Sequence, residues 1–96
     1  MTIFIKDTRL LIDERLRMAL KPTLLTVNDE SALHAGHAMN SVGGHYLVTI
    51  VSSRFNGKSR LVRHRIVYNI LSDVMQQSRV HALSIRAYTF EEFNKS

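Results

Sequence analysis

Cysteine is absent from the 96-residue sequence, and this absence narrows the chemistry that the chain can perform. No disulfide can form, and no thiolate is available as a nucleophile or as a metal ligand. Any bound metal would therefore need histidine, aspartate or glutamate, or sulfur from a partner. The sequence also has no tryptophan and an aromatic content of 7%, which disfavours an RNA-binding surface built on exposed rings.

Long apolar runs and targeting signals are missing as well. No apolar run approaches the roughly 20 residues that a membrane-spanning helix needs. Residues 1–7 lack the apolar stretch and the small-residue cleavage site of a signal peptide. We therefore expect a cytoplasmic protein without a membrane partner. There is no glycine-rich phosphate loop and no nucleophile beside an evident base, and Asp29-Glu30 is an isolated acidic pair, so we do not expect an enzyme.

The composition that remains is typical of one globular domain. Hydrophobic residues make up 45% and charged residues 22%, and a chain of 96 residues can build one modest core. The formal net charge is +5 with neutral histidines. This surplus is compatible with binding to nucleic acid, to an acidic protein or to anionic lipid, and equally with an ordinary solvated surface.

The periodicity of the apolar residues predicts the element order α-β-β-α-β-α. Helices are expected at residues 7–20, about 60–76 and 89–93, and strands at 24–29, 45–52 and 80–88. Thr89 and Glu92 fit a capping box at the start of the last helix. The first two strands should be antiparallel, whereas the crossover helix predicts a parallel pairing of the second and third. The expected fold is therefore α+β, a three-stranded mixed sheet with helices on one face.

Four of the five histidines should gather at one edge of this sheet. In a parallel pair both strands start at the same edge, so His45 and His81 should be neighbours. The loop that enters the second strand at that edge carries His34 and His37. Alternation along the third strand places His81 on the same face as Leu83.

Two interpretations of these histidines remain open. Each can be a solvated loop residue or a hydrogen-bonded residue at a strand end. Alternatively they form an open, incomplete metal site that needs sulfur from elsewhere, or a stand-alone zinc or copper site made by His34, His37, His45 and His81.

Cationic side chains cluster around the start of the second long helix. Cations at a helix N-terminus oppose the helix macrodipole, whereas free N–H groups beside arginines are suited to phosphate. The alternative is that these side chains solvate a turn and reach acidic neighbours. The cluster comprises Arg54, Lys58, Arg60, Arg63 and Arg65, with His64 among them.

Several segments together resemble the BolA family. The combination of Arg63-His64-Arg65 with the later Val80-His81-Ala82-Leu83 is specific, and the resemblance runs from about residue 8 to residue 93 of a single domain spanning 1–96. The other segments are Leu20-Lys21-Pro22, Asp29-Glu30-Ser31, residues 46–59, Ile66-Val67-Tyr68 and the closing Tyr88-Thr89-Phe90-Glu91-Glu92-Phe93.

The resemblance implies a BolA-like fold similar to a class II KH domain, in agreement with the predicted element order. It also implies a heterodimer with a monothiol glutaredoxin that shares a [2Fe-2S] cluster, in which the glutaredoxin cysteine and glutathione supply sulfur. It assigns one imidazole ligand to His81. The second ligand would come from the loop, where His34 matches best and His37 is the rival. The expected role is iron-sulfur cluster trafficking or iron regulation, and no cluster is expected in the isolated protein.

Some BolA-like proteins are described as DNA-binding transcriptional regulators that affect cell shape and stress response. If this chain shares that activity, we expect the contacts to come from Lys58, Arg60, Arg63 and Arg65. The sequence has no Gly-x-x-Gly loop, with which KH domains hold a nucleic-acid backbone. KH-like recognition of nucleic acid therefore does not follow from the fold alone.

Overall fold

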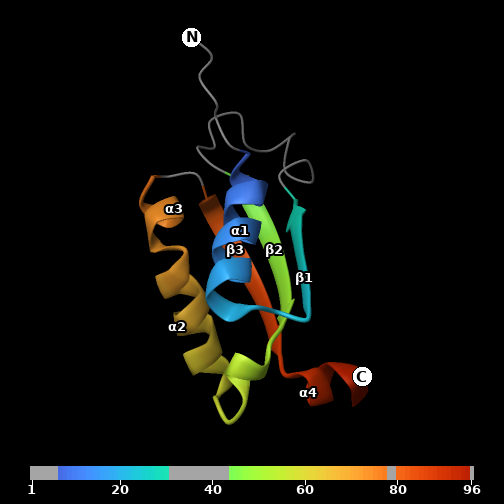
Figure 1. The fold of residues 1–96 in the computed structure, drawn as a ribbon. Coiled ribbons are helices and arrows are strands. Elements are labelled where there is room, and N and C mark those ends of the chain that lie inside the picture. The colour runs from blue at the N-terminus through green and yellow to red at the C-terminus, as the bar shows by residue number, and fades with distance from the viewer. Residues whose placement is uncertain (1–6, 31–43, 78–79, 96) are drawn as a thin grey trace.

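The computed structural model describes residues 7–30, 44–77 and 80–95, which form a mixed sheet and a layer of helices (Figure 1). The helices are α1 (Thr8–Leu20), α2 (Arg60–Ile70), α3 (Ser72–Gln76) and α4 (Phe90–Lys95), and a 3-10 turn covers Ser53–Phe55. The strands are β1 (Leu24–Asp29), β2 (Gly44–Val51) and β3 (Val80–Tyr88). The predicted order of elements is confirmed. Among the described residues, no helix has the length and the apolar character that crossing a membrane requires.

Polar side chains cap the starts of three of the helices. Asp7 caps α1 and Ser59 caps α2, each accepting a hydrogen bond from a backbone N–H of the first turn. The predicted capping box is present at α4. The backbone N–H of Thr89 donates to the Glu92 carboxylate at 2.8 Å, and the backbone N–H of Glu92 donates to the Thr89 hydroxyl at 3.2 Å.

The single helix predicted over 60–76 is divided in two. The chain leaves helical geometry at Leu71, where φ is −96° and ψ is 12°, and resumes as α3. Leu71 and Val74 are both buried in the core cluster. With Val67, they keep the i, i+4, i+7 spacing of one helical face, so the apolar stripe predicted over 60–76 continues from α2 into α3 despite the interruption.

The sheet has the predicted mixed topology, with strand order β1-β2-β3. β1 pairs with β2 in antiparallel fashion from Leu24 opposite Val51 to Asp29 opposite Tyr46. β2 pairs with β3 in parallel fashion, with Val51 opposite Tyr88 at the far end. The starts of β2 and β3 therefore lie at one edge, as the crossover predicted.

The core lies between the sheet and the helices α1, α2 and α3, which cover one face of it (Figure 1). Ile12, Leu16 and Leu20 recur every four residues along α1 and are all buried, which explains why this segment is an amphipathic helix. They join Val48 and Ile50 of the central strand, neither of which is exposed. The prediction that the helices pack on one face is confirmed for these three.

The pairing of β2 with β3 is irregular at the position of His81. Gly44 lies opposite Val80, but the next residue, His45, lies opposite Ala82. His81 is therefore an extra residue on β3, as in a β-bulge. Val80 and Leu83 both pack on the core side of the sheet. Strict alternation would put two residues three positions apart on opposite faces. The alternation that assigned His81 to the face of Leu83 thus does not extend across this irregularity.

Candidate functional site

One candidate site lies at the edge where β2 and β3 begin. Gly44, the first residue of β2, is opposite Val80, the first residue of β3. The backbone N–H of Glu30 donates to the carbonyl oxygen of His45 at 2.7 Å, so the two ends of the 31–43 segment are tied together at the same edge. The backbone of His81 is therefore within the same corner of the sheet as both ends of the loop. This arrangement is the one predicted from the parallel crossover.

The imidazoles assigned to this edge fall largely outside the described residues. His34 and His37 lie in the segment 31–43, and the side chain of His81 is likewise outside what the structure describes. Within 7–30, 44–77 and 80–95, no three histidine, aspartate or glutamate side chains come together as a metal site would require. The ligand set therefore remains a prediction, as does the stand-alone site of four histidines.

Tyr46 is a buried residue close to the start of β2, at the same edge of the sheet. Its side chain is buried, and burial raises the pKa of its phenol, with the carboxylate of Asp29 acting in the same direction. The phenol belongs to the core cluster, close to the start of β2.

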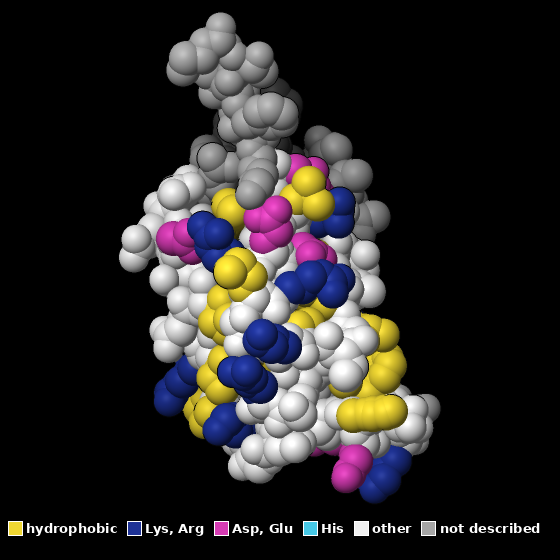
Figure 2. All heavy atoms as spheres, viewed as in Figure 1, with side chains coloured by type: hydrophobic (Ala, Val, Ile, Leu, Met, Phe, Trp, Pro, Cys, Tyr) yellow, Lys and Arg dark blue, Asp and Glu magenta, His cyan; other side chains and the backbone are white. Residues whose placement is uncertain are grey.

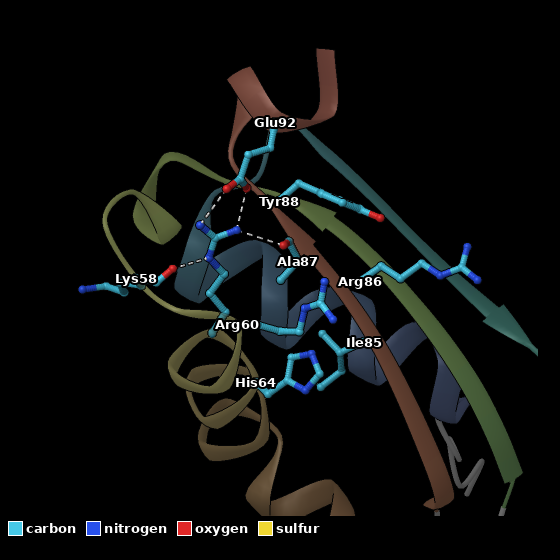
Figure 3. Close-up of a pocket in the computed structure, with 9 residues that line it drawn as sticks. Lys58, Arg60, His64, Ile85, Arg86, Ala87, Tyr88 and Glu92 are labelled. Carbon is cyan, nitrogen blue, oxygen red and sulfur yellow. Dashed lines mark hydrogen bonds and ion pairs between the residues drawn. The ribbon is translucent and has the colours of Figure 1, made fainter. Parts of the chain in front are cut away.

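A second candidate site is an open groove at the opposite end of β3, between the first turns of α2 and the outer edge of the sheet (Figure 3). Its volume is about 680 Å³. Figure 3 shows Arg60 and His64 extending from α2 toward Ile85, whereas Lys58 and Arg86 point outward from the two sides. The lining residues are Lys58, Arg60, Arg63, His64, Ile85, Arg86, Ala87, Tyr88 and Glu92.

Arg63 is the structural centre of this groove. It is buried, and its guanidinium donates to the Lys58 carbonyl at 2.9 Å and to the Ala87 carbonyl at 3.1 Å. It also binds the Glu92 carboxylate in bidentate fashion, at 2.6 Å and 3.1 Å. The guanidinium lies 5.9 Å from the centroid of the buried Phe55 ring. Arg63 thus joins α2, β3 and α4, and its donors are committed to these partners.

The cations predicted to contact nucleic acid are therefore not equivalent. Lys58 and Arg60 are exposed and line the groove, whereas Arg65 is exposed but does not line it. Arg63 differs from all three because it is buried and paired with Glu92. On the face seen in Figure 2, the lysine and arginine side chains of the lower half have few acidic neighbours, whereas those of the upper half lie beside Asp or Glu.

Sequence reasoning missed Arg86 and Glu92 as members of this groove. Alternation puts Arg86 on the face of β3 opposite to Ile85 and Ala87, where a charge is solvated, so this pattern does not indicate that Arg86 lines the groove. Glu92 was assigned to the capping box alone. Its second role requires the Arg63 side chain of α2 to reach α4 near the end of β3, and no local pattern encodes that contact.

The electrostatics of Glu92 follow from these contacts. Hydrogen bonding from Arg63, supported by the backbone N–H of Thr89, lowers the pKa of Glu92 from 4.5 to about 2. The carboxylate is therefore ionised throughout the neutral and mildly acidic range, and it neutralises the buried guanidinium.

Glutamine at position 92 is expected to destabilise the protein near neutral pH but not in strong acid. Since the pKa of Glu92 is lower in the folded than in the unfolded chain, the ionised carboxylate favours folding. That contribution is fully present above about pH 5 and is lost as the pH falls toward about 2. Melting temperatures of wild type and Glu92→Gln, followed by circular dichroism across this range, should converge at the acidic end. The exposed Glu91→Gln is the matched control on α4, and a difference at position 92 that persists in strong acid would contradict the assignment.

The fold defines a class of small α+β proteins, with a three-stranded mixed sheet and a cationic groove between α2 and β3. The chain belongs to the BolA family: residues 16–92 match the family model described as BolA-like protein. The resemblance seen in the sequence is therefore confirmed.

Individual relatives agree with this assignment. The DNA-binding transcriptional regulator BolA of Escherichia coli (strain K12) is 40% identical over 82 residues, covering 85% of this chain and 75% of the relative. BolA-like protein 1 of Mus musculus is 44% identical over 78 residues, covering 81% of this chain and 55% of the relative. The chain thus spans about half the length of the mouse relative.

A solved structure shows the same fold. The BolA domain of SufE1 from Arabidopsis thaliana superposes with a TM-score of 0.79 at 40% identity, covering 93% of this chain and 99% of that domain. The α+β prediction with a three-stranded mixed sheet is confirmed by this likeness and by the observed topology.

Proposed function

We propose that this chain is a non-enzymatic adaptor that binds a monothiol glutaredoxin and co-ligates a shared [2Fe-2S] cluster. The observation that carries the proposal is the parallel register of β2 and β3. It brings Val80, next to His81, opposite Gly44, where the segment containing His34 and His37 joins β2. A ligand on a strand and a ligand on an adjoining loop would thereby share one edge.

The donor set of the chain fits half of such a cluster. It has five histidines and no cysteine, so it can offer imidazole but no thiolate. His81 and one of His34 or His37 would hold one iron, and the glutaredoxin cysteine with glutathione would complete the other. Imidazole in place of thiolate gives a cluster a higher reduction potential than ligation by four thiolates. Because this chain has no thiolate, the sulfur ligands of the cluster would have to come from the partner and glutathione.

The test is to mix the wild-type protein with a cluster-loaded monothiol glutaredoxin near pH 7.5, where imidazole is largely neutral and can ligate. We expect a stoichiometric change in visible absorption and circular dichroism, together with a heterodimer in size-exclusion chromatography. Cluster-free glutaredoxin is the control. An unaltered cluster spectrum at excess protein would exclude the proposed function.

A second candidate function is DNA binding with transcriptional regulation. Two observations favour it: Lys58, Arg60 and Arg65 are exposed around the start of α2, and the Escherichia coli relative bears the name of a DNA-binding regulator. Phosphate contacts from such side chains make affinity fall steeply with salt. The test is a titration of the protein with duplex DNA at physiological salt. The absence of saturable binding would exclude this candidate.

A further inference from the structure

We propose that the groove between α2 and the outer edge of β3 is a binding site for phosphate groups, and that Glu92 acts as a built-in competitor within it. The inference is independent of the cluster proposal, because the groove lies at the end of β3 opposite to His81. Four observations carry it. They are the net positive charge of the lining, the lack of acidic partners for its exposed cations among the described residues, the hydrogen-bonded carbonyls at the edge of β3, and the position of Glu92.

The lining carries a surplus of positive charge. The lining residues include four cations, Lys58, Arg60, Arg63 and Arg86, but one carboxylate, Glu92, which is already bound to Arg63. His64 adds a further nitrogen donor or acceptor. The groove therefore has a positive electrostatic potential that acidic side chains do not compensate. Concave walls of low dielectric constant focus such a potential.

The exposed cations of the groove are unpaired in the part of the chain that the structure describes. Lys58, Arg60 and Arg86 have no acidic partner there, whereas Arg15 is paired with Asp73 at 2.6 Å and Arg17 with Asp13 at 2.7 Å. The chain thus neutralises arginines on α1 and leaves those of the groove available. Unpaired guanidinium groups suit phosphate because their planar donors can contact two oxygens at once.

The edge of β3 is closed to an added peptide strand. The carbonyl of Leu83 accepts a hydrogen bond from the Tyr68 hydroxyl at 3.1 Å, and the carbonyl of Ala87 accepts one from Arg63 at 3.1 Å. An extended peptide would need both acceptors to continue the sheet. The occupant that the groove favours is therefore recognised by its charge rather than by its backbone. Half-buried Ile85 and Ala87 form an apolar floor on which a sugar or base can rest.

Glu92 lies where a ligand phosphate would be attracted. Its carboxylate binds the fork of Arg63, yet its side chain is 47% exposed. No residue of α4 is buried, and the Tyr88 and Phe93 rings, with centroids 5.7 Å apart, provide a further contact with β3. A phosphate entering the groove is thus repelled by Glu92 and competes with it for Arg63. Removing the charge of Glu92 should strengthen binding.

The experiment measures binding of a fluorescein-labelled twelve-nucleotide oligothymidylate by anisotropy at low and at physiological salt. Inorganic pyrophosphate and ATP serve as competitors, and a duplex of the same length forms a separate arm. The variants are Arg60→Ala, Arg86→Ala and Glu92→Gln among the lining residues, and Arg65→Ala on α2 outside the groove, which distinguishes the groove from the DNA-binding candidate. Arg17→Ala, on α1 and outside both, is the control. Far-UV circular dichroism at low temperature verifies that each variant is folded.

We expect Arg60→Ala and Arg86→Ala each to weaken binding on the order of threefold, and Glu92→Gln to strengthen it by a similar factor. Arg17→Ala should bind as the wild type does, and Arg65→Ala should leave binding in the groove unchanged. Competition by pyrophosphate or ATP would identify free phosphate compounds as ligands, and binding of the oligonucleotide alone would identify a nucleic-acid backbone; both support the site.

Two results would overturn the inference. If duplex or single-stranded DNA binds but only Arg65→Ala weakens it, phosphate is held outside the groove, and the DNA-binding candidate survives without it. If no labelled or competing phosphate compound binds to wild type or to Glu92→Gln, the groove proposal and the DNA-binding candidate both fail. Neither result bears on the glutaredoxin complex.

Discussion

Replacing His81 by alanine is expected to abolish the spectral change that the wild-type protein produces on a cluster-loaded monothiol glutaredoxin. In the proposed complex, His81 supplies an imidazole that no other residue at the start of β3 can replace. Loss of groups that merely support a metal ligand costs about 10–100-fold in affinity, so loss of the ligand itself should cost at least ~100-fold. Visible circular dichroism of the mixture, titrated to excess protein, measures the effect.

Other histidine variants make this test specific. His64→Ala removes a histidine that lines the groove at the far end of β3, so it should leave the cluster spectrum as in wild type. His34→Ala and His37→Ala distinguish the two candidates for the loop ligand, because only one of them should reproduce the loss. His81→Cys should restore ligation with an altered spectrum, since a thiolate can replace the imidazole. A wild-type spectrum from His81→Ala would show that another residue is the ligand.

Replacing Arg63 by alanine is expected to lower the free energy of unfolding by about 3 kcal/mol, since removing the buried guanidinium leaves two backbone carbonyls and the Glu92 carboxylate without their donor. The guanidinium holds two carbonyls and the Glu92 carboxylate, and its side chain is 10% exposed. For a domain of this size, each kcal/mol corresponds to about 4–8 °C in melting temperature. Urea and thermal unfolding, followed by circular dichroism, measure both quantities.

The neighbouring arginine provides a matched control for this loss. Arg65 is exposed on the same helix, so Arg65→Ala should change stability by no more than about 0.5 kcal/mol. Arg63→Lys keeps the charge but loses the fork that binds Glu92 in bidentate fashion, so its loss should be intermediate. Equal stability of the alanine variants at positions 63 and 65 would show that the buried network contributes nothing.

Much of the fold follows from the sequence because its signals are local. Ile12, Leu16 and Leu20 establish the amphipathic face of α1, and the capping box from Thr89 to Glu92 begins α4. The helical segment between β2 and β3 requires a long crossover, and this predicts parallel pairing and a common edge for both strand starts. Each of these signals lies within a few residues or depends only on the order of elements.

The sequence determined which edge of the sheet carries the proposed ligands. It did not determine on which face of β3 His81 lies. The absence of cysteine requires any shared cluster to take its sulfur from a partner, and the element order brings the histidine-bearing loop to the start of β3. The extra residue at His81 arises from pairing with Gly44 and His45, which lie far away in the chain. Alternation along one strand contains no information about such an irregularity.

The cationic groove was decided by the tertiary structure. In the sequence, Arg63 and Arg65 are two arginines of one basic cluster, and both were predicted to contact phosphate. In the folded protein, Arg63 lies over Phe55 and binds Glu92, a residue 29 positions later, whereas Arg65 faces solvent. The physical reason is that composition determines how many charges a chain carries, but the placement of α2 and α4 relative to β3 determines which of them are neutralised. The same packing brings in Arg86 and leaves it available at the groove.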